Sequence, residues 1–307
     1  MHGKFHRLIN KKYLTWTLFL SYYISTLFLH LKISNIITKP IETSLGSFSI
    51  SQQMNSISII SCSFLFLFII FKTSKGQNKY ITIFYWFLFF ASMFLTKSFI
   101  LFHPNEYFHI PQYAILTILF SLCLDPDKTL IPIGRLLFWI SVMGALDELN
   151  QYFFLCTQYG NYLDFNDMLL NIQGAAAGIL LLYGFKTYNN PDKPFQLSLR
   201  TFYSPEVLFI LICFLLLTIL TCSDTLHINT AIEIPQGGIE SINGKTHIFL
   251  EKKPEMFGSF LPTPSKGKYY ILTPLEGMAC MLAFGLLFYS FKIWIIKIRA
   301  GTIIRKS

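Results

Sequence analysis

Apolar residues occur along the chain in long uninterrupted runs, and polar residues gather in shorter segments between them. A run of about 20 apolar residues is long enough to cross a bilayer as a helix. Eight runs come close to this length: Tyr13–Leu31, Met54–Phe71, Tyr80–Phe102, Asn105–Leu124, Leu130–Gln151, Asp167–Phe185, Val207–Cys222 and Tyr269–Ile296. Because the apolar residues do not alternate with polar ones, a β-barrel is disfavoured. The pattern predicts an all-α polytopic membrane protein with about eight transmembrane helices.

The composition supports this fold class. Of the 307 residues, 53% are apolar and 13% are charged, whereas an average soluble domain has about 25% charged residues. The 32 Phe and 16 Tyr residues also exclude a disordered chain, because disordered chains are poor in aromatic residues.

One segment between the spans has a different pattern. In residues 223–268, apolar and polar residues alternate through Ile232, Ile234 and Ile239 and again in Thr246–Leu250. Asn243-Gly244 separates the two stretches, and this dipeptide is typical of a tight hairpin turn. We expect a small extracytoplasmic β-hairpin insert, which is either a passive loop or a substrate-recognition element. The chain then divides into an N-terminal three-span region, a three-span core and a C-terminal two-span region that carries the insert, at residues 1–104, 105–187 and 188–307.

Lysine and arginine predict the orientation of the spans, because they are enriched in cytoplasmic loops. With both termini in the cytoplasm, 17 of the 25 basic residues and 4 of the 16 acidic residues lie inside. The net charge is then +13 inside and −4 outside. We therefore expect a multi-pass protein of the cell membrane with both termini cytoplasmic. The same loop charges account for the overall charge of +9 without a nucleic acid as a partner.

Ionisable residues inside a span cost about 2.5 to 3.5 kcal/mol each on insertion scales, and they therefore suggest function. The fourth span is long enough only if it begins at Asn105, which brings Glu106 and His109 into its first turns. Glu106, His109 and Tyr113 then follow one another at i, i+3 and i+7. This spacing places them on one helix face.

The next two spans carry polar residues at the ends that face the same side of the membrane. The fifth span ends with Asp147, Glu148 and Gln151. Asp147 and Gln151 are four residues apart and share a face, whereas Glu148 points about 100° away. The sixth span begins with Asp167 and Asn171 on one face, which continues with small residues suited to close helix packing. By the charge count, all of these residues lie at the outer ends of their spans.

Capping and packing are alternatives for each residue taken alone. Asp164 or Asp167 can cap the sixth helix, and Asn171 or Gln151 can hydrogen-bond neighbouring helices. Helix packing does not require four carboxylates and a histidine at one membrane level, so the set as a whole favours a site. Glu276, near the outer end of the eighth span, is a further candidate.

Taken together, the three clusters resemble the VanZ-like family of membrane proteins, which is named after an accessory protein that lowers sensitivity to teicoplanin. The motifs are Glu106-x-x-His109-x-x-x-Tyr113, Asp147-Glu148-x-x-Gln151 and Asp167-x-x-x-Asn171-x-x-Gly174, in the family's order. They cover about a quarter of the chain. The family usually has an arginine between the second and third motifs, and this chain has none there. The resemblance implies a cell-envelope role connected with teicoplanin-type resistance, but it implies no particular reaction.

The residues leave three functions open. In the first, the protein is a hydrolase or transferase that acts on a lipid-linked envelope substrate. Glu148 or His109 would be the general base, and Asp147 and Asp167 would hold it or a divalent cation such as Mg²⁺, which prefers oxygen ligands. The catalytic candidates are Glu106, His109, Asp147, Glu148 and Asp167, and the substrate-binding candidates are Tyr113, Gln151 and Asn171.

In the second function, the protein is a non-enzymatic membrane protein or scaffold that binds a lipid-linked precursor, an ion or a lipoglycopeptide in the same polar site. In the third, the carboxylates serve proton-coupled transport. Transport requires polar groups along the whole membrane. We expect none at the cytoplasmic ends of these helices, which disfavours the third function.

Overall fold

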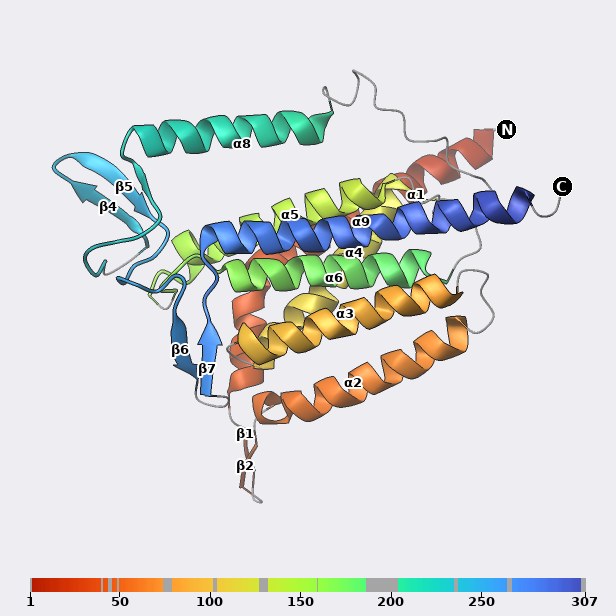
Figure 1. Cartoon of the computed structure of the whole chain (residues 1–307), viewed down its shortest axis with the longest axis horizontal. Coiled ribbons are helices and arrows are strands. Elements are labelled where there is room, and N and C mark those ends of the chain that lie inside the picture. Colours follow the sequence, from red (N-terminus) through yellow and green to blue (C-terminus); the bar gives the residue numbers. More distant parts are fainter. Residues whose placement is uncertain are drawn as a thin grey trace.

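The prediction of a mainly helical protein is confirmed by a computed structural model of the chain. The structure describes residues 2–39, 41–43, 46–48, 50–73, 79–101, 104–126, 132–158, 160–185, 204–234, 237–263 and 267–304. The long helices lie side by side, and strands gather at one end of the bundle (Figure 1). The helices are α1 (His2–Thr38), α2 (Ile50–Thr73), α3 (Lys79–Phe99), α4 (His109–Leu124), α5 (Ile133–Asn150), α6 (Phe165–Tyr183), α8 (Pro205–Cys222) and α9 (Pro274–Ile304).

Within the described residues, five helices are long and apolar enough to cross a membrane. They are α3, α4 with its preceding turn from Glu106, α6, α8 and residues 274–295 of α9. Helix α5 contains Arg135, Asp147 and Glu148, which reduce its mean hydropathy. That α1, α2 and α5 also cross the membrane, and that the termini are cytoplasmic, stay predictions.

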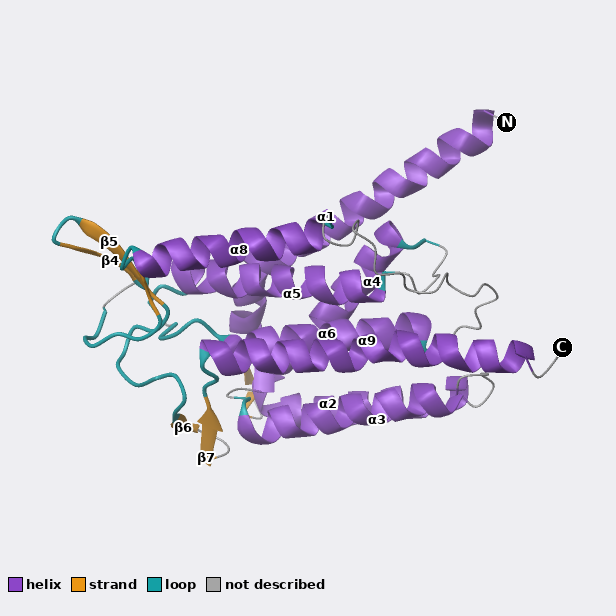
Figure 2. Cartoon of the chain, turned by 45° about the horizontal axis from the view of Figure 1, so that its top comes forward, coloured by secondary structure: helices purple, strands orange, loops and turns teal. Residues whose placement is uncertain are grey.

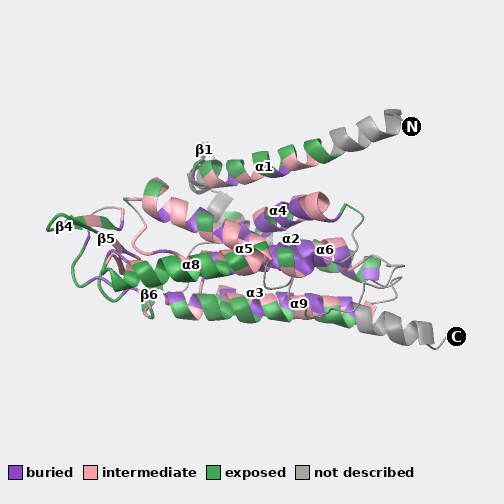
Figure 3. Cartoon of the chain, turned by 90° about the horizontal axis from the view of Figure 1, so that it is seen from above, coloured by how far each residue is buried: buried purple, intermediate pink, exposed green. Residues whose placement is uncertain are grey.

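Helix α6 lies at the centre of the bundle and is buried along nearly its whole length (Figure 3). Glycine and alanine residues allow α4 to approach it closely. A Cβ atom at Gly174 would lie 2.7 Å from the carbonyl oxygen of Ile110, and one at Gly178 would lie 2.7 Å from that of Ala114. The close approach places the residues of α4 and α6 within hydrogen-bonding distance of each other.

Helix α8 lies at the edge of the bundle and has no buried residue (Figure 2). It contacts α5 through its first turns, where the Phe209 and Trp139 rings lie 5.5 Å apart. Glu206 in its first turn accepts hydrogen bonds from Arg135 Nε, at 2.7 Å, and from Trp139 Nε1, at 3.1 Å. Apolar side chains that stay exposed along a whole helix are favourable in lipid and unfavourable in water. The exposure of α8 therefore agrees with a membrane environment.

The strands form three small sheets: β1 (Ile41–Thr43) with β2 (Gly46–Phe48), β3 (Leu226–His227) with β5 (Lys245–Phe249) and β4 (Ile239–Ile242), and β6 (Phe260–Thr263) with β7 (Gly267–Tyr270). β4 and β5 pair antiparallel across Asn243 and Gly244, both at positive φ. Of the expected stretch through Ile232, Ile234 and Ile239, only Ile239 lies in a strand, and the prediction is wrong around Ile232 and Ile234. The Thr230 hydroxyl donates to the Ile232 carbonyl and accepts from its N–H, which holds this segment in a turn.

The insert packs on the connection between α5 and α6. The Leu163 N–H donates to the Leu250 carbonyl at 2.8 Å, and the Lys252 N–H donates to the Asn161 carbonyl at 2.7 Å. A short 3₁₀ turn, η1 (Pro104–Phe108), precedes α4, and a π-helical turn, η2 (Gln151–Leu155), follows α5. The predicted helix from Asn105 is therefore present, but its first turn, which contains Glu106, is 3₁₀, and α-helical geometry begins at His109.

Candidate active site at the insert end of the bundle

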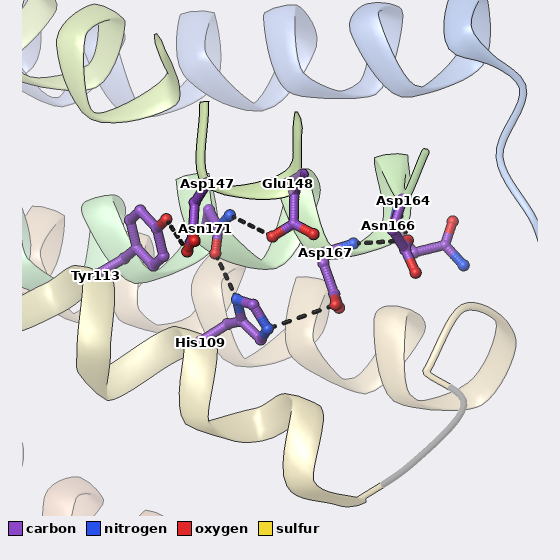
Figure 4. A network of polar contacts seen from close by, with 8 residues as sticks. All are labelled: His109, Tyr113, Asp147, Glu148, Asp164, Asn166, Asp167 and Asn171. Carbon is purple, nitrogen blue, oxygen red and sulfur yellow. Dashed lines mark hydrogen bonds and ion pairs between the residues drawn. The ribbon is translucent and has the colours of Figure 1, made fainter. Parts of the chain in front are cut away.

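His109 is the centre of a buried polar network between α4, α5 and α6 (Figure 4). Its side chain is 1% exposed. The Nδ1 atom lies 2.7 Å from Asn171 Oδ1, and the Nε2 atom lies 3.4 Å from Asp167 Oδ2. Because the amide oxygen can only accept, Nδ1 carries a proton, and Nε2 faces the carboxylate.

Asn171 determines how His109 is oriented. Its amide nitrogen donates to Glu148 Oε1 at 3.3 Å, which leaves the amide oxygen for His109. The side chain packs against Gly144 of α5, where an added Cβ would lie 2.9 Å from the Asn171 side chain. Close packing of α5 and α6 at this glycine therefore joins the histidine to Glu148.

Asp147 and Glu148 are neighbours in the sequence but have different environments. Asp147 is fully buried, and its Oδ2 atom accepts a hydrogen bond of 2.9 Å from the Tyr113 hydroxyl. Glu148 lines a cavity. The angle of about 100° between successive helical residues explains the difference. Of the two carboxylates, Glu148 is the one that a ligand in the cavity can reach.

Asp164 connects the network to the start of α6. Its Oδ1 atom accepts from the backbone N–H groups of Asn166, at 2.9 Å, and Asp167, at 3.1 Å. It therefore caps the helix and fixes the backbone of Asp167. Burial raises the pKa of the Asp164 carboxyl to about 6, against the opposing effect of these hydrogen bonds.

A cavity of about 440 Å³ lies between the α5–α6 connection and the insert. Its lining includes the carboxylates of Glu148, Asp164 and Asp167, and the lining residues described contain no lysine or arginine. Gln151 also lines the cavity, from the π-helical turn after α5. These carboxyl groups would place a negative electrostatic potential in the cavity when they are ionised.

Tyrosines form much of the remaining wall, and sequence reasoning missed them. Tyr152, Tyr162 and Tyr269 all line the cavity. The hydroxyls of Tyr162 and Tyr269 lie 3.1 Å apart, and burial raises the pKa of both phenols. The only indication of Tyr162 in the sequence is its position two residues before Asp164. Nothing in the sequence indicates Tyr269 as a site residue, because only the folding of the insert brings it to the cavity.

Glu106 and Glu276 were also candidates. The negative charge of Glu106 helps to raise the pKa of Tyr162 and Tyr269, so it lies near the cavity. Glu276 has a different role: its carboxylate accepts from the Thr273 N–H and hydroxyl and from the Tyr270 hydroxyl. This is a capping box at the start of α9.

His109, Glu148 and Asp167 could also hold a metal ion, since each offers a ligand atom within 4.8 Å of those of the other two. Among the described residues, Asp167 Oδ1 is buried and has no hydrogen-bond partner. Two carboxylates and one imidazole suit Mg²⁺ or Mn²⁺ better than a thiolate-preferring metal. The donor set therefore fits a divalent cation.

A second polar cluster lies at the other end of α4 and α6, where we expected none. The Tyr183 hydroxyl donates to Asp125 Oδ2 at 3.0 Å and lies 2.7 Å from the Ser121 hydroxyl. Thr117 separates this cluster from the site and packs against Gly178, at 2.8 Å from a Cβ placed there. The expectation of apolar cytoplasmic ends was therefore wrong, although helix packing closes the space between the two clusters.

Fold and site together define a helical protein in which five of the described helices are long and apolar enough to cross a membrane, with a histidine–carboxylate network beside a cavity. No protein family, curated protein or solved structure matches the chain. Membership of the VanZ-like family stays a prediction from the three motifs.

Proposed function

We propose that the protein is a VanZ-like integral membrane protein that carries out hydrolysis or group transfer on a lipid-linked component of the cell envelope. The observation that carries this proposal is the His109 network beside the cavity. His109 Nε2 faces Asp167 at 3.4 Å, and Glu148 and Asp167 open onto the same space. A histidine and two carboxylates so placed can exchange protons with a bound ligand.

The roles follow from what each side chain contacts. Asn171 holds the His109 Nδ1 proton, so Nε2 is the nitrogen that gains and loses a proton. Asp167 stabilises the charged form of the histidine, and Glu148 is the second acid–base group. The alternative role of the same side chains is to hold a divalent cation: His109 Nε2, Glu148 and Asp167 would then be ligands instead of acid–base groups, and the cation would supply charge stabilisation for a phosphate or an acyl oxygen.

The cavity lining supports a polar, uncharged headgroup as the ligand. Tyrosine rings present apolar faces with a hydroxyl at the edge, which suits a sugar ring or a peptide. An anionic group would be repelled by Glu148, Asp164 and Asp167 unless a divalent cation is bound. Burial raises the pKa of the Cys156 thiol at the cavity, so a thiolate nucleophile is disfavoured. The proposed reaction therefore depends on acid–base catalysis by His109 and Glu148 instead of a cysteine nucleophile.

The charge distribution along the chain supports an outward-facing cavity. With both termini in the cytoplasm, the insert and the acidic ends of α5 and α6 lie on the non-cytoplasmic side. Envelope precursors with a lipid anchor present their headgroups at this membrane surface. The apolar helices provide the route for the lipid part.

Teicoplanin susceptibility in a glycopeptide-sensitive host tests the proposal. The wild-type chain, Glu148→Gln and Asp147→Asn are compared with an empty vector at matched membrane abundance, with vancomycin in parallel. Glu233→Gln is the control, because Glu233 is exposed and paired with Lys253. We expect a wild-type shift for teicoplanin that disappears in Glu148→Gln and persists in Glu233→Gln. A shift that survives Glu148→Gln would refute catalysis at this carboxylate.

Non-enzymatic binding is the second candidate, and the cavity itself favours it. Its tyrosine wall and polar lining would hold the headgroup of a lipid precursor or a lipoglycopeptide without any reaction. Binding of teicoplanin to the purified protein separates the two functions. An enzyme loses turnover in Glu148→Gln and keeps binding, whereas a binding protein keeps its phenotype wherever binding is kept.

A further inference from the structure

A second group of metal-ligating side chains lies in the insert, outside the cavity lining. His227 ends β3, His247 lies in β5, and Asp224 lies in the turn after α8. One ligand atom from each lies within 4.8 Å of those from the other two. His227 Nε2 and His247 Nδ1 are 2.9 Å apart. The sequence alone suggested no partner for either histidine.

The backbone holds these side chains in place. β3 and β5 pair in parallel, with His227 beside Phe249, so both histidines belong to adjacent strands of one sheet. The His227 ring stacks on the Phe249 ring with 4.7 Å between centroids. Asp224 has a φ of 56°, in the left-handed region that aspartate adopts more readily than most residues. Its backbone oxygen lies 3.1 Å from His227 Nε2.

We propose that Asp224, His227 and His247 bind Zn²⁺ or a similar divalent transition-metal ion. Two imidazoles and a carboxylate make a three-ligand zinc site with one position open to water. Zinc–nitrogen bonds of about 2.0–2.1 Å in a tetrahedral site place the two nitrogens about 3.3 Å apart. The two rings therefore need to separate by only about 0.4 Å. In the metal-free protein the two nitrogens share a proton, and the ion takes the place of that proton.

Access and charge agree with this assignment. The Asp224 side chain is 86% exposed, so an ion can reach the site from solvent and the carboxylate can turn toward it. Glu240 is the direct cross-strand partner of His247, which places a second carboxylate on the same face of the sheet. Imidazole ligands favour zinc over Mg²⁺ or Ca²⁺.

The site also lies next to the wall of the cavity. The carbonyl of Phe249, which follows His247 by two residues in β5 and pairs with His227, accepts a 2.8 Å hydrogen bond from the Tyr152 hydroxyl. Tyr152 lines the cavity. A metal ion that joins β3 to β5 therefore braces the strand on which this tyrosine rests. The inference needs no reaction at His109 and does not depend on the proposed function.

Zinc titration of the full chain in detergent, after treatment with a chelator, tests the proposal by calorimetry and by thermal unfolding. The variants are His247→Gln, His227→Gln and Asp224→Asn, with Glu233→Gln as the control for a lost surface carboxylate and His109→Gln as the control for the other histidine site. Mg²⁺ is titrated in parallel. The unfolding midpoint without metal shows whether each variant is folded.

We expect Zn²⁺ to bind at a site that needs both insert histidines. We expect no Mg²⁺ binding that depends on these two histidines. Each histidine variant should weaken zinc binding at least about tenfold and remove the rise in unfolding midpoint. Glu233→Gln and His109→Gln should retain both effects. Unchanged zinc affinity in folded His227→Gln and His247→Gln would overturn the proposal, since the contact would then be an ordinary hydrogen bond. Loss of zinc binding in His109→Gln alone would overturn it as well.

Discussion

Replacing Gly174 by alanine should damage the site through helix packing, without touching any polar group. The new Cβ would lie 2.7 Å from the Ile110 carbonyl oxygen and from Tyr113 Cβ, and 3.1 Å from the His109 carbonyl oxygen. Normal contacts for such atoms are about 3.5–4.0 Å. Two of these atoms belong to the backbone, so α4 must move away from α6.

The size of the effect follows from two opposing contributions. Overpacking of a well-packed interface costs about 1–3 kcal/mol. Alanine in a helix is more favourable than glycine by about 0.5–1 kcal/mol. The net loss should therefore be up to about 2 kcal/mol. Because α4 carries His109, its displacement also lengthens the 2.7 Å contact with Asn171 Oδ1.

Gly285 provides a matched control in α9. A Cβ at this position meets Ile172 Cδ1 at 3.5 Å, an ordinary contact. Gly285→Ala should therefore be neutral or stabilising by up to about 1 kcal/mol. Unfolding of both variants in mixed detergent measures the difference in stability, and the proposed teicoplanin susceptibility assay measures any difference in function. Equal stability of the two variants within about 0.5 kcal/mol would refute the packing argument.

Three further changes test other parts of the structure. The pKa of Asp164 is about 6 in the folded protein, against an ordinary value of 3.8. The folded state therefore holds this proton more tightly than the unfolded chain does. The free energy of unfolding should fall as the pH rises from about 4 to about 6, by at most about 3 kcal/mol. Asp164→Asn retains the cap and should remove this fall in unfolding scans; a persisting fall would assign it to another group. Glu276→Ala should cost about 0.5–2 kcal/mol through loss of the Thr273 capping box, and a loss of phenotype at unchanged stability would contradict a purely structural role. Gln173→Leu removes the 2.7 Å hydrogen bond to Thr96 Oγ1 and should cost about 0.6 kcal/mol in the same assay; a loss above about 2 kcal/mol would mean that Gln173 has a further role.

Much of the helical framework could be predicted from the sequence, because a helix in a membrane is encoded locally. A sufficiently long apolar run forms a helix to satisfy its own backbone hydrogen bonds, whatever its neighbours are. The expected run at 207–222 corresponds to α8, with Ser204 as the cap and Pro205 at the first helical position. The insert was harder to predict, since hydroxyl-to-backbone hydrogen bonds at Thr230 compete with strand formation.

The candidate site was predictable as a set of residues but not as a geometry. Spacing brought Glu106, His109 and Asp167 to the same end of the bundle. It could not show that Asp147 pairs with Tyr113 while Glu148 lines the cavity, since that depends on the rotation of α5 about its own axis. Packing against neighbouring helices sets this rotation.

The sequence by itself determined that the chain forms long apolar helices and that acidic residues and a histidine gather near the ends of neighbouring helices. Both depend on residues close together along the chain. Only the tertiary structure decided that Tyr269 closes the cavity and that His227 meets His247. In both cases the side chains come from segments that are distant in sequence or lie on different strands. Only packing and strand register bring such side chains within contact distance.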